Sequence, residues 1–182
     1  MDAAAFDFDA GVLGLGLPPE VEAALRSAGE LRGSQPIHAM AQLMRARELA
    51  PEHPAVLIAF YRHYFYDHRL EAARDIARRA LVVGARALGL PPLWREVPGV
   101  ALADTAGNAR TRFYLFVLKG YAYLSLRLDD DIEARDALAK LRALDPQDHV
   151  GSALLETVRV RALVGDLDDD DEELPLRQLR HG

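Results

Sequence analysis

Small and apolar residues recur along the chain at spacings of three and four, the period that places them on one face of a helix. Three segments show this most clearly, each with an alanine followed by apolar residues four and seven positions later. These segments are Ala39, Leu43 and Ala46; Ala73, Ala77 and Ala80; and Ala134, Leu138 and Leu141. Because small side chains allow helices to approach closely, the pattern predicts helices that pack in pairs.

Prolines and glycines indicate where these helices begin and end. Pro51 and Pro146 each follow the last residue of a segment by five positions, and proline cannot continue a helix. Pro18 and Pro19 suit the first turn of an earlier helix. The helix that begins at Leu70 meets no proline near Ala85, and Gly89, Pro91 and Pro92 follow, so we expect it to extend to Leu88. The chain is therefore expected to form about seven helices and no sheet.

The spacing of these residues resembles the tetratricopeptide repeat (TPR), a helix-turn-helix unit of about 34 residues. Ala39 and Ala73 lie one such period apart, and the repeats fall at 20–53, 54–87 and 115–148. The resemblance implies an all-α, TPR-like superhelix or solenoid of antiparallel hairpins, about three in number. A solvated C-terminal capping helix would follow the last hairpin.

Interruptions in this pattern divide the chain into parts. Residues 1–17 are rich in glycine and apolar side chains and are expected to form an N-terminal arm before the helical domain at 18–165. Prolines and glycines make 89–108 an irregular insertion within that domain. The insertion contains Trp94, the only tryptophan, which either fills the gap in the array or belongs to a binding lip.

The C-terminal residues 166–182 are expected to form a disordered acidic tail. The block 166–173 is acidic at every position except Leu167, and such a run of like charges repels itself and stays solvated. It cannot be a calcium loop, because Asp171 stands where that loop requires glycine.

Composition and charge exclude or disfavour several classes of function. The formal net charge is −6, which disfavours nucleic acid as a partner because phosphate binding needs a basic face. The chain has no cysteine, so disulfides and thiolate metal sites are excluded. No apolar run approaches the ~18 residues of a membrane span. Since Asp2 stands where a secretory signal would carry Lys or Arg, we expect a cytoplasmic protein.

No motif of an enzyme, a metal site or a cofactor site is present. The chain lacks a G-x-S-x-G elbow, a P-loop and an H-E-x-x-H sequence. His63 and Asp67 lie one helical turn apart and could share a metal, whereas His68 points about 140° away from His63 on an ideal helix. We therefore expect no catalytic residue, no cofactor and no metal. A metal-binding or enzymatic accessory role that uses His63, Asp67 and His68 remains an alternative.

The resemblance implies a binding site, because the first helices of successive tetratricopeptide repeats line a concave groove that receives peptides. When the repeats at 20–53, 54–87 and 115–148 are matched to the family's pattern, two small residues, Ala24 and Ala28, are expected in that groove. A larger set of cationic and bulky side chains is expected there as well. The larger set is Arg32, Ile58, Arg62, Phe65, Tyr66, Phe116, Lys119, Tyr123, Leu126 and Arg127. Cations pair with carboxylates and aromatic rings give rigid contact area, so the expected partner is a protein segment with acidic or aromatic side chains.

These observations predict a non-catalytic protein–protein interaction module: a scaffold, an adaptor or an assembly chaperone. The alternative is a structural protein that self-associates, for example as a homodimer, or whose own arm or tail fills the groove. Residues 54–70 also resemble small repeat proteins encoded beside bacterial nitrogen-fixation genes. That resemblance implies a partner that is a metalloenzyme or part of its assembly machinery.

Overall fold

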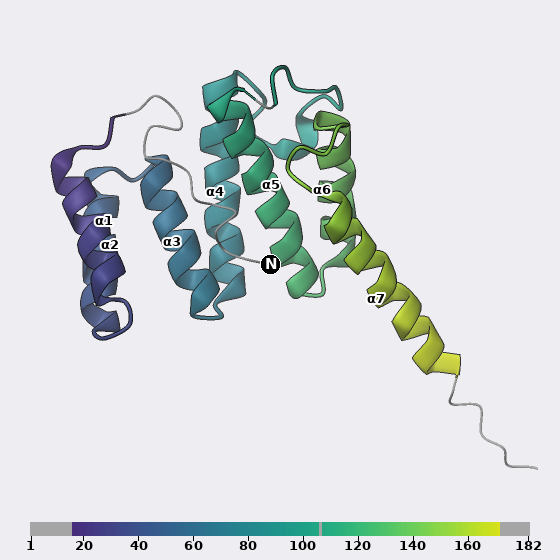
Figure 1. Ribbon diagram of the computed structural model, residues 1–182, viewed down its shortest axis with the longest axis horizontal. Coiled ribbons are helices and arrows are strands. Elements are labelled where there is room, and N and C mark those ends of the chain that lie inside the picture. Colours follow the sequence, from purple (N-terminus) through teal and green to yellow (C-terminus); the bar gives the residue numbers. More distant parts are fainter. Residues whose placement is uncertain (1–15, 106, 172–182) are drawn as a thin grey trace, which may run out of the picture.

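The computed structural model describes the backbone of residues 16–105 and 107–171, and the side chains of these residues as far as Val164. This part of the chain contains seven α-helices and one short 3₁₀ helix, and no strand (Figure 1). They are α1 (Pro19–Leu31), α2 (Pro36–Leu49), α3 (Pro54–Tyr66), α4 (Leu70–Leu88), η2 (Trp94–Glu96), α5 (Ala109–Arg127), α6 (Asp131–Leu144) and α7 (Ala153–Asp171). None of the described helices combines the length and the apolar character needed to span a membrane.

The helices pair as antiparallel hairpins, α1 with α2, α3 with α4 and α5 with α6, which confirms the predicted all-α architecture (Figure 1). Side chains stabilise several helix starts: His53 Nδ1 accepts from the Ala55 amide at 3.2 Å, and the Asn108 side chain accepts from the Arg110 amide at 2.9 Å. Such caps satisfy amides that have no partner inside the helix.

The backbone turns show that the hairpins repeat one another. His68 and Asp129 both adopt the left-handed conformation, at φ 57° and 56°, two positions after the last residue of the first helix of their hairpins. The next amide then bonds back across the turn in the same way, from Arg69 to the Tyr64 carbonyl and from Asp130 to that of Ser125, both at 2.9 Å. Neither residue is a glycine, so the sequence pattern did not reveal this shared turn.

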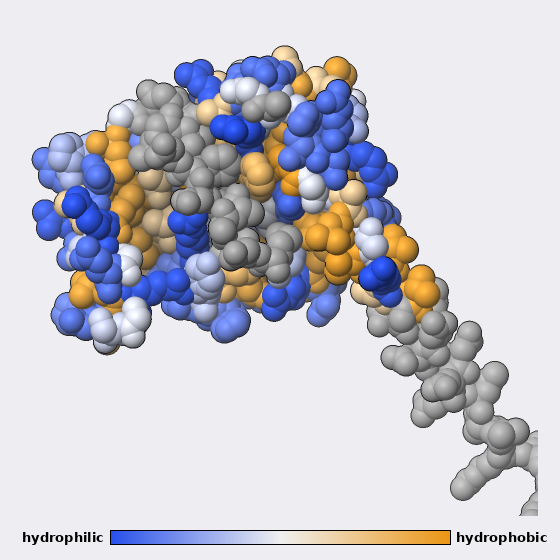
Figure 2. Space-filling view, viewed as in Figure 1, coloured by the Kyte–Doolittle hydropathy of each residue, from blue (hydrophilic) through white to orange (hydrophobic). Residues whose placement is uncertain are grey.

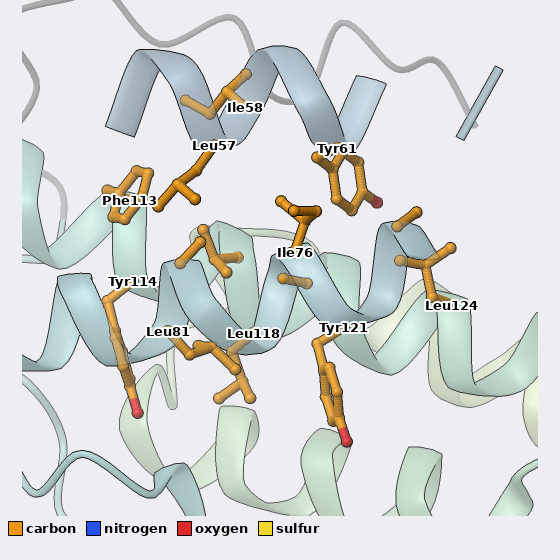
Figure 3. Close-up of a cluster of buried hydrophobic side chains, with 14 of the residues drawn as sticks. Leu57, Ile58, Tyr61, Ile76, Leu81, Phe113, Tyr114, Leu118, Tyr121 and Leu124 are labelled. Atoms are coloured by element: carbon orange, nitrogen blue, oxygen red, sulfur yellow. The ribbon is translucent and has the colours of Figure 1, made fainter. Parts of the chain in front are cut away.

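The core lies between the central helices. All nine residues of the three alanine-led segments are buried, as their spacing predicted. Tyr61 of α3 points toward Ile76 of α4, while Leu81 and Leu118 lie lower in the view, beside Tyr114 and Tyr121 (Figure 3); all belong to one buried cluster. The absence of a side chain at Gly84 allows the rings of Phe113 and Tyr114 to approach, since an added Cβ would lie 3.2 Å from each.

The two ends of the array pack less extensively than its middle. α4 and α5 contact each other along their length, whereas α2 with α3 and α6 with α7 meet over short stretches. In Figure 1 the α1–α2 hairpin stands apart from α3, and the C-terminal half of α7 projects beyond α6. The four helices α3–α6 therefore form the most closely packed part of the described structure.

α7 differs from the expected capping helix and from the expected tail. It continues to Asp171, so 166–171 are helical and the predicted disorder is wrong for these residues. The reason is local: after Gly165 no proline occurs before Pro175, and aspartate is compatible with a helix although it does not favour one. The surface of α7 is also apolar where a solvated cap would be polar, with Leu154 65% exposed. Residues 1–15 of the predicted arm (1–17) and residues 172–182 of the predicted tail (166–182) lie outside the described residues.

The insertion between α4 and α5 is held against the helices, and its described residues, which leave out 106, contain only η2 as regular structure. Trp94 is 9% exposed, and its ring centroid lies 6.0 Å from that of Tyr121 on α5. The Leu102 amide donates to the Leu144 carbonyl at 2.9 Å, and Lys140 Nζ donates to the carbonyls of Arg95, at 3.1 Å, and Val97. Trp94 is thus enclosed at the interruption in the array, as expected of a residue that fills this gap.

Candidate partner-binding surface

Cationic and aromatic side chains from three hairpins meet in one continuous row, the cation–aromatic belt. It consists of Arg32, Tyr66, Phe65, Tyr123 and Arg127. The Arg32 guanidinium lies 4.1 Å from the centroid of the Tyr66 ring, and the Tyr66 and Phe65 centroids are 5.7 Å apart. Phe65 reaches Tyr123 at 6.1 Å between centroids, and Arg127 lies 5.9 Å from the Tyr123 centroid. The structure therefore brings together five of the residues that the groove prediction named.

The positions of these residues on their helices explain why they meet. α1, α3 and α5 run in the same direction, so their C-terminal ends lie at the same end of the array, the lower end in Figure 1. Arg32 follows the last residue of α1, Tyr66 ends α3 and Arg127 ends α5. Tyr123 and Arg127 are one turn apart, and the Arg127 guanidinium donates to the Tyr123 hydroxyl at 3.0 Å.

The belt carries positive charge that the rest of the described chain does not neutralise. Among the described residues, no carboxylate lies within ion-pair distance of Arg32 or Arg127. Some arginines elsewhere are paired, for example Arg74 with Asp130 at 2.9 Å and Arg159 with Asp131 at 3.1 Å. A cation over an aromatic face is stabilised by about 0.5–1 kcal/mol at an exposed site, which orients the guanidinium without cancelling its charge. The belt is thus a locally basic, aromatic surface on an acidic protein.

The remaining predicted groove residues are less open than expected. Arg62, Phe116 and Leu126 are half-buried. Ile58 is only 8% exposed and belongs to the core, and so do Ala24 and Ala28. The prediction that these three line an open surface is wrong, because the faces of α1 and α3 that carry them turn toward the neighbouring helices.

The groove prediction is also wrong for Lys119. Its Nζ donates to the Val150 carbonyl at 2.6 Å, so the ammonium holds the turn before α7 against α5. Burial lowers the pKa of Lys119, although the nearby Asp148 carboxylate opposes this shift. A lysine engaged in this way does not offer the open cation that the groove prediction assigned to it.

Tyr61 is a residue of this surface that the prediction did not include. Its ring stacks on Phe65, with 6.0 Å between centroids and 7° between planes, and supports the belt from beneath. Burial raises the pKa of the Tyr61 hydroxyl far above its usual range. The spacing of four between Tyr61 and Phe65 could have indicated the stack, because such pairs meet on a helix.

At the alternative site, His63 and Asp67 form a pair, and His68 does not join them. His63 Nε2 lies 3.2 Å from the Asp67 carboxylate. His68 occupies the left-handed position of the turn after α3. Among the described side chains, no three histidine or carboxylate groups are placed so that they could share a metal ion. The three residues therefore offer at most two ligands in this arrangement.

His63 makes the stability depend on pH. Burial lowers the pKa of His63, and the nearby Arg32 and Arg69 lower it further, while Asp67 opposes them. The unfolded chain therefore binds a proton near pH 6.5 that the folded chain takes up only at lower pH.

We expect the free energy of unfolding to decrease as the pH falls from 7.5 to 5.5, and the decrease to be smaller in His63→Gln. Urea denaturation at several pH values measures both slopes. His38→Gln, a change at an exposed position of α2, is the control and should keep the wild-type slope. Identical slopes for wild type and His63→Gln would contradict this assignment.

A cleft of about 720 Å³ lies at the opposite end of the array. Its walls come from the turn before α3, the end of α4 and the start of α5. They comprise Gly16, Pro18, Ala50, Pro51, Glu52, His53, Val83, Arg86, Ala87 and Arg110. Arg86 and Glu52 pair at 2.7 Å on this wall. No sequence motif indicated the cleft, because its walls are distant along the chain.

Comparisons with known proteins give one informative match. No family model matches the chain, and no solved structure matches it. The chain is similar to an uncharacterized 19.8 kDa protein in the nifW 5′ region of Azotobacter chroococcum mcd 1, with 46% identity over 116 residues. The match covers 62% of this chain and 64% of the other, so the chain spans less than two thirds of that relative's length. This α-helical protein thus has a homologue whose gene lies beside a nif gene.

Proposed function

We propose that this protein is a non-catalytic interaction module of the tetratricopeptide type, which binds a partner's acidic or aromatic segment on the cation–aromatic belt. The observation that carries the proposal is the continuous row from Arg32 through Tyr66, Phe65 and Tyr123 to Arg127. The row joins all three hairpins, so a ligand lying along it would contact every repeat.

The side chains of the belt indicate which chemical groups a ligand should carry. The guanidinium groups of Arg32 and Arg127 can each bind a carboxylate through two parallel hydrogen bonds. Tyr66 is 42% exposed, and its ring offers contact area at a low cost in conformational entropy. A segment with acidic side chains at its ends and an aromatic residue between them matches this order of cation, ring and cation.

The genomic setting of the homologue suggests the pathway. A protein encoded in the nifW 5′ region is compatible with an accessory role in nitrogen fixation. We therefore propose that the partner belongs to the metalloenzyme of that process or to its assembly machinery, and that the module acts as a scaffold or an assembly chaperone in the cytoplasm.

Charge reversal in the belt is expected to abolish capture of this partner. The double variant Arg32→Glu and Arg127→Glu replaces two attractive charges by repulsive ones, and each lost contact should weaken binding at least tenfold, about 1.4 kcal/mol. The measurement is retention of a partner from an extract of nitrogen-fixing cells on the immobilised protein, followed by titration of the purified partner.

Arg135→Glu is the matched control. Arg135 has a half-exposed side chain and lies on α6, which contributes no belt residue. A partner retained by wild type and by this control, but lost from the belt variant, supports the proposal. A partner that binds all three proteins equally shows that the belt is not its binding surface.

A further inference from the structure

The length of the cation–aromatic belt limits which ligands can reach both of its ends. The separations between successive members, from Arg32 to Arg127, are 4.1 Å, 5.7 Å, 6.1 Å and 5.9 Å. The two guanidinium groups are therefore at most about 22 Å apart along the row. A ligand that pairs with both arginines must hold its two carboxylates at a matching separation.

The rings of the belt are held in place by their neighbours. Tyr66 and Arg127 are exposed, whereas the other three members are half-buried. Phe65 lies between the rings of two other belt members, and Tyr61 stacks on it from beneath with 6.0 Å between centroids. A surface that is already ordered loses little conformational entropy when a ligand binds. The fixed separation of the two cations can therefore discriminate between ligands.

An extended segment fits this row better than a helix does. An extended chain rises about 3.3 Å per residue and directs alternate side chains to one face, so side chains on that face repeat every ~6.6 Å. This repeat is close to the 5.7 Å and 6.1 Å between neighbouring ring centroids of the belt. A bound helix, in contrast, needs an apolar groove for its apolar face. On the face of the protein seen in Figure 2, hydrophilic residues predominate at the lower end of the array, where α1, α3 and α5 end.

We propose that the belt selects an extended segment of seven residues, with acidic side chains at its first and seventh positions and an aromatic side chain at its third or fifth. This inference rests on the proposed function and specifies its ligand. Only even separations place both carboxylates on the same face of the segment, and a separation of six spans about 20 Å, whereas four spans about 13 Å. The carboxylates would pair with Arg32 and Arg127, and the aromatic ring between them would lie against the rings of the belt.

Three synthetic peptides of equal length and composition test this spacing. Each contains two glutamates in a background of alanine and glutamine, with a tyrosine two positions after the first glutamate. The glutamates are separated by three, six or about fourteen positions, the last of which matches the row only when the peptide is helical. NMR titration of the full chain measures dissociation constants up to the millimolar range. The peptide with a separation of six is expected to bind roughly tenfold more tightly than the peptide with a separation of three, which reaches only one arginine. Tightest binding of the longest separation would show a helical ligand and overturn the proposal.

Single variants separate a failure of this inference from a failure of the proposed function. Arg32→Gln and Arg127→Gln should each reduce binding of the peptide with a separation of six to the level of the peptide with a separation of three, because one contact is left. Arg135→Gln on α6 is the control and should leave all affinities unchanged, and circular dichroism verifies that each variant is folded. Equal binding of all three peptides, weakened alike by both belt variants, would overturn the selection by spacing and leave the belt as the binding surface. Peptides that do not bind, or that bind the belt variants as tightly as wild type, would overturn the proposed function as well.

Discussion

Replacing Ala73 with glutamate is expected to lower the free energy of unfolding by about 4 kcal/mol, the largest effect of any single change considered for this protein. Ala73 is 0% exposed and belongs to the core cluster, so the new carboxylate would lose its hydration there. It would also need space between helices whose close approach depends on a small side chain. Both effects have the same sign.

The matched control is Ala139→Glu, which makes the same change at an exposed position within α6. It should alter the free energy of unfolding by less than about 0.5 kcal/mol. Thermal unfolding followed by circular dichroism measures both variants, and a loss of about 4 kcal/mol corresponds to a decrease in Tm of roughly 8–16 °C for a chain of this size. Similar decreases for the two variants would show that Ala73 does not lie at a helix crossing.

Replacing Trp94 with alanine is expected to lower the free energy of unfolding by about 3 kcal/mol. The indole is 9% exposed and packs on Tyr121, and the Arg95 guanidinium lies 4.5 Å from its centroid. Its removal would leave a cavity where the insertion covers α5. The effect should fall at the low end of the range for such changes, because the Leu102–Leu144 and Lys140 hydrogen bonds still hold the insertion in place.

Leu93→Ala, at the neighbouring residue, is the control for the tryptophan variant. Leu93 is 58% exposed, so its truncation should cost less than about 0.5 kcal/mol. Urea denaturation followed at 222 nm compares the two without relying on tryptophan fluorescence. A Trp94→Ala variant that keeps its stability but loses partner binding would instead make Trp94 part of a binding lip, the alternative that the sequence left open.

The helices and their pairing could be predicted because both depend on local properties. The alanine-led segments predicted the buried faces of α2, α4 and α6, and the breakers after Leu88 and Ala50 predicted where helices end. The shared turns at His68 and Asp129 could not be predicted, since the left-handed conformation there is adopted without the glycine that usually indicates it.

The candidate site was predictable only in part, for a related reason. The frame of the repeat identified which side of α3 and α5 should carry the belt, and Phe65, Tyr66, Tyr123 and Arg127 do meet there. It could not show that Ile58 turns into the core or that Lys119 bonds to Val150, because these outcomes depend on how closely neighbouring repeats approach.

The sequence by itself determined that this chain is helical, where its breaks fall and which faces of α2, α4 and α6 are buried, because helical periodicity is a property of residues three and four positions apart. Only the tertiary structure decided which cations remain unpaired, that Trp94 is enclosed and that the apolar side of α7 stays open to solvent. Those properties depend on partners far along the chain. Arg32 meets Tyr66 across two hairpins and Trp94 meets Tyr121 across the insertion, whereas Leu154 and Val164 have no helix opposite them within the described part of the chain.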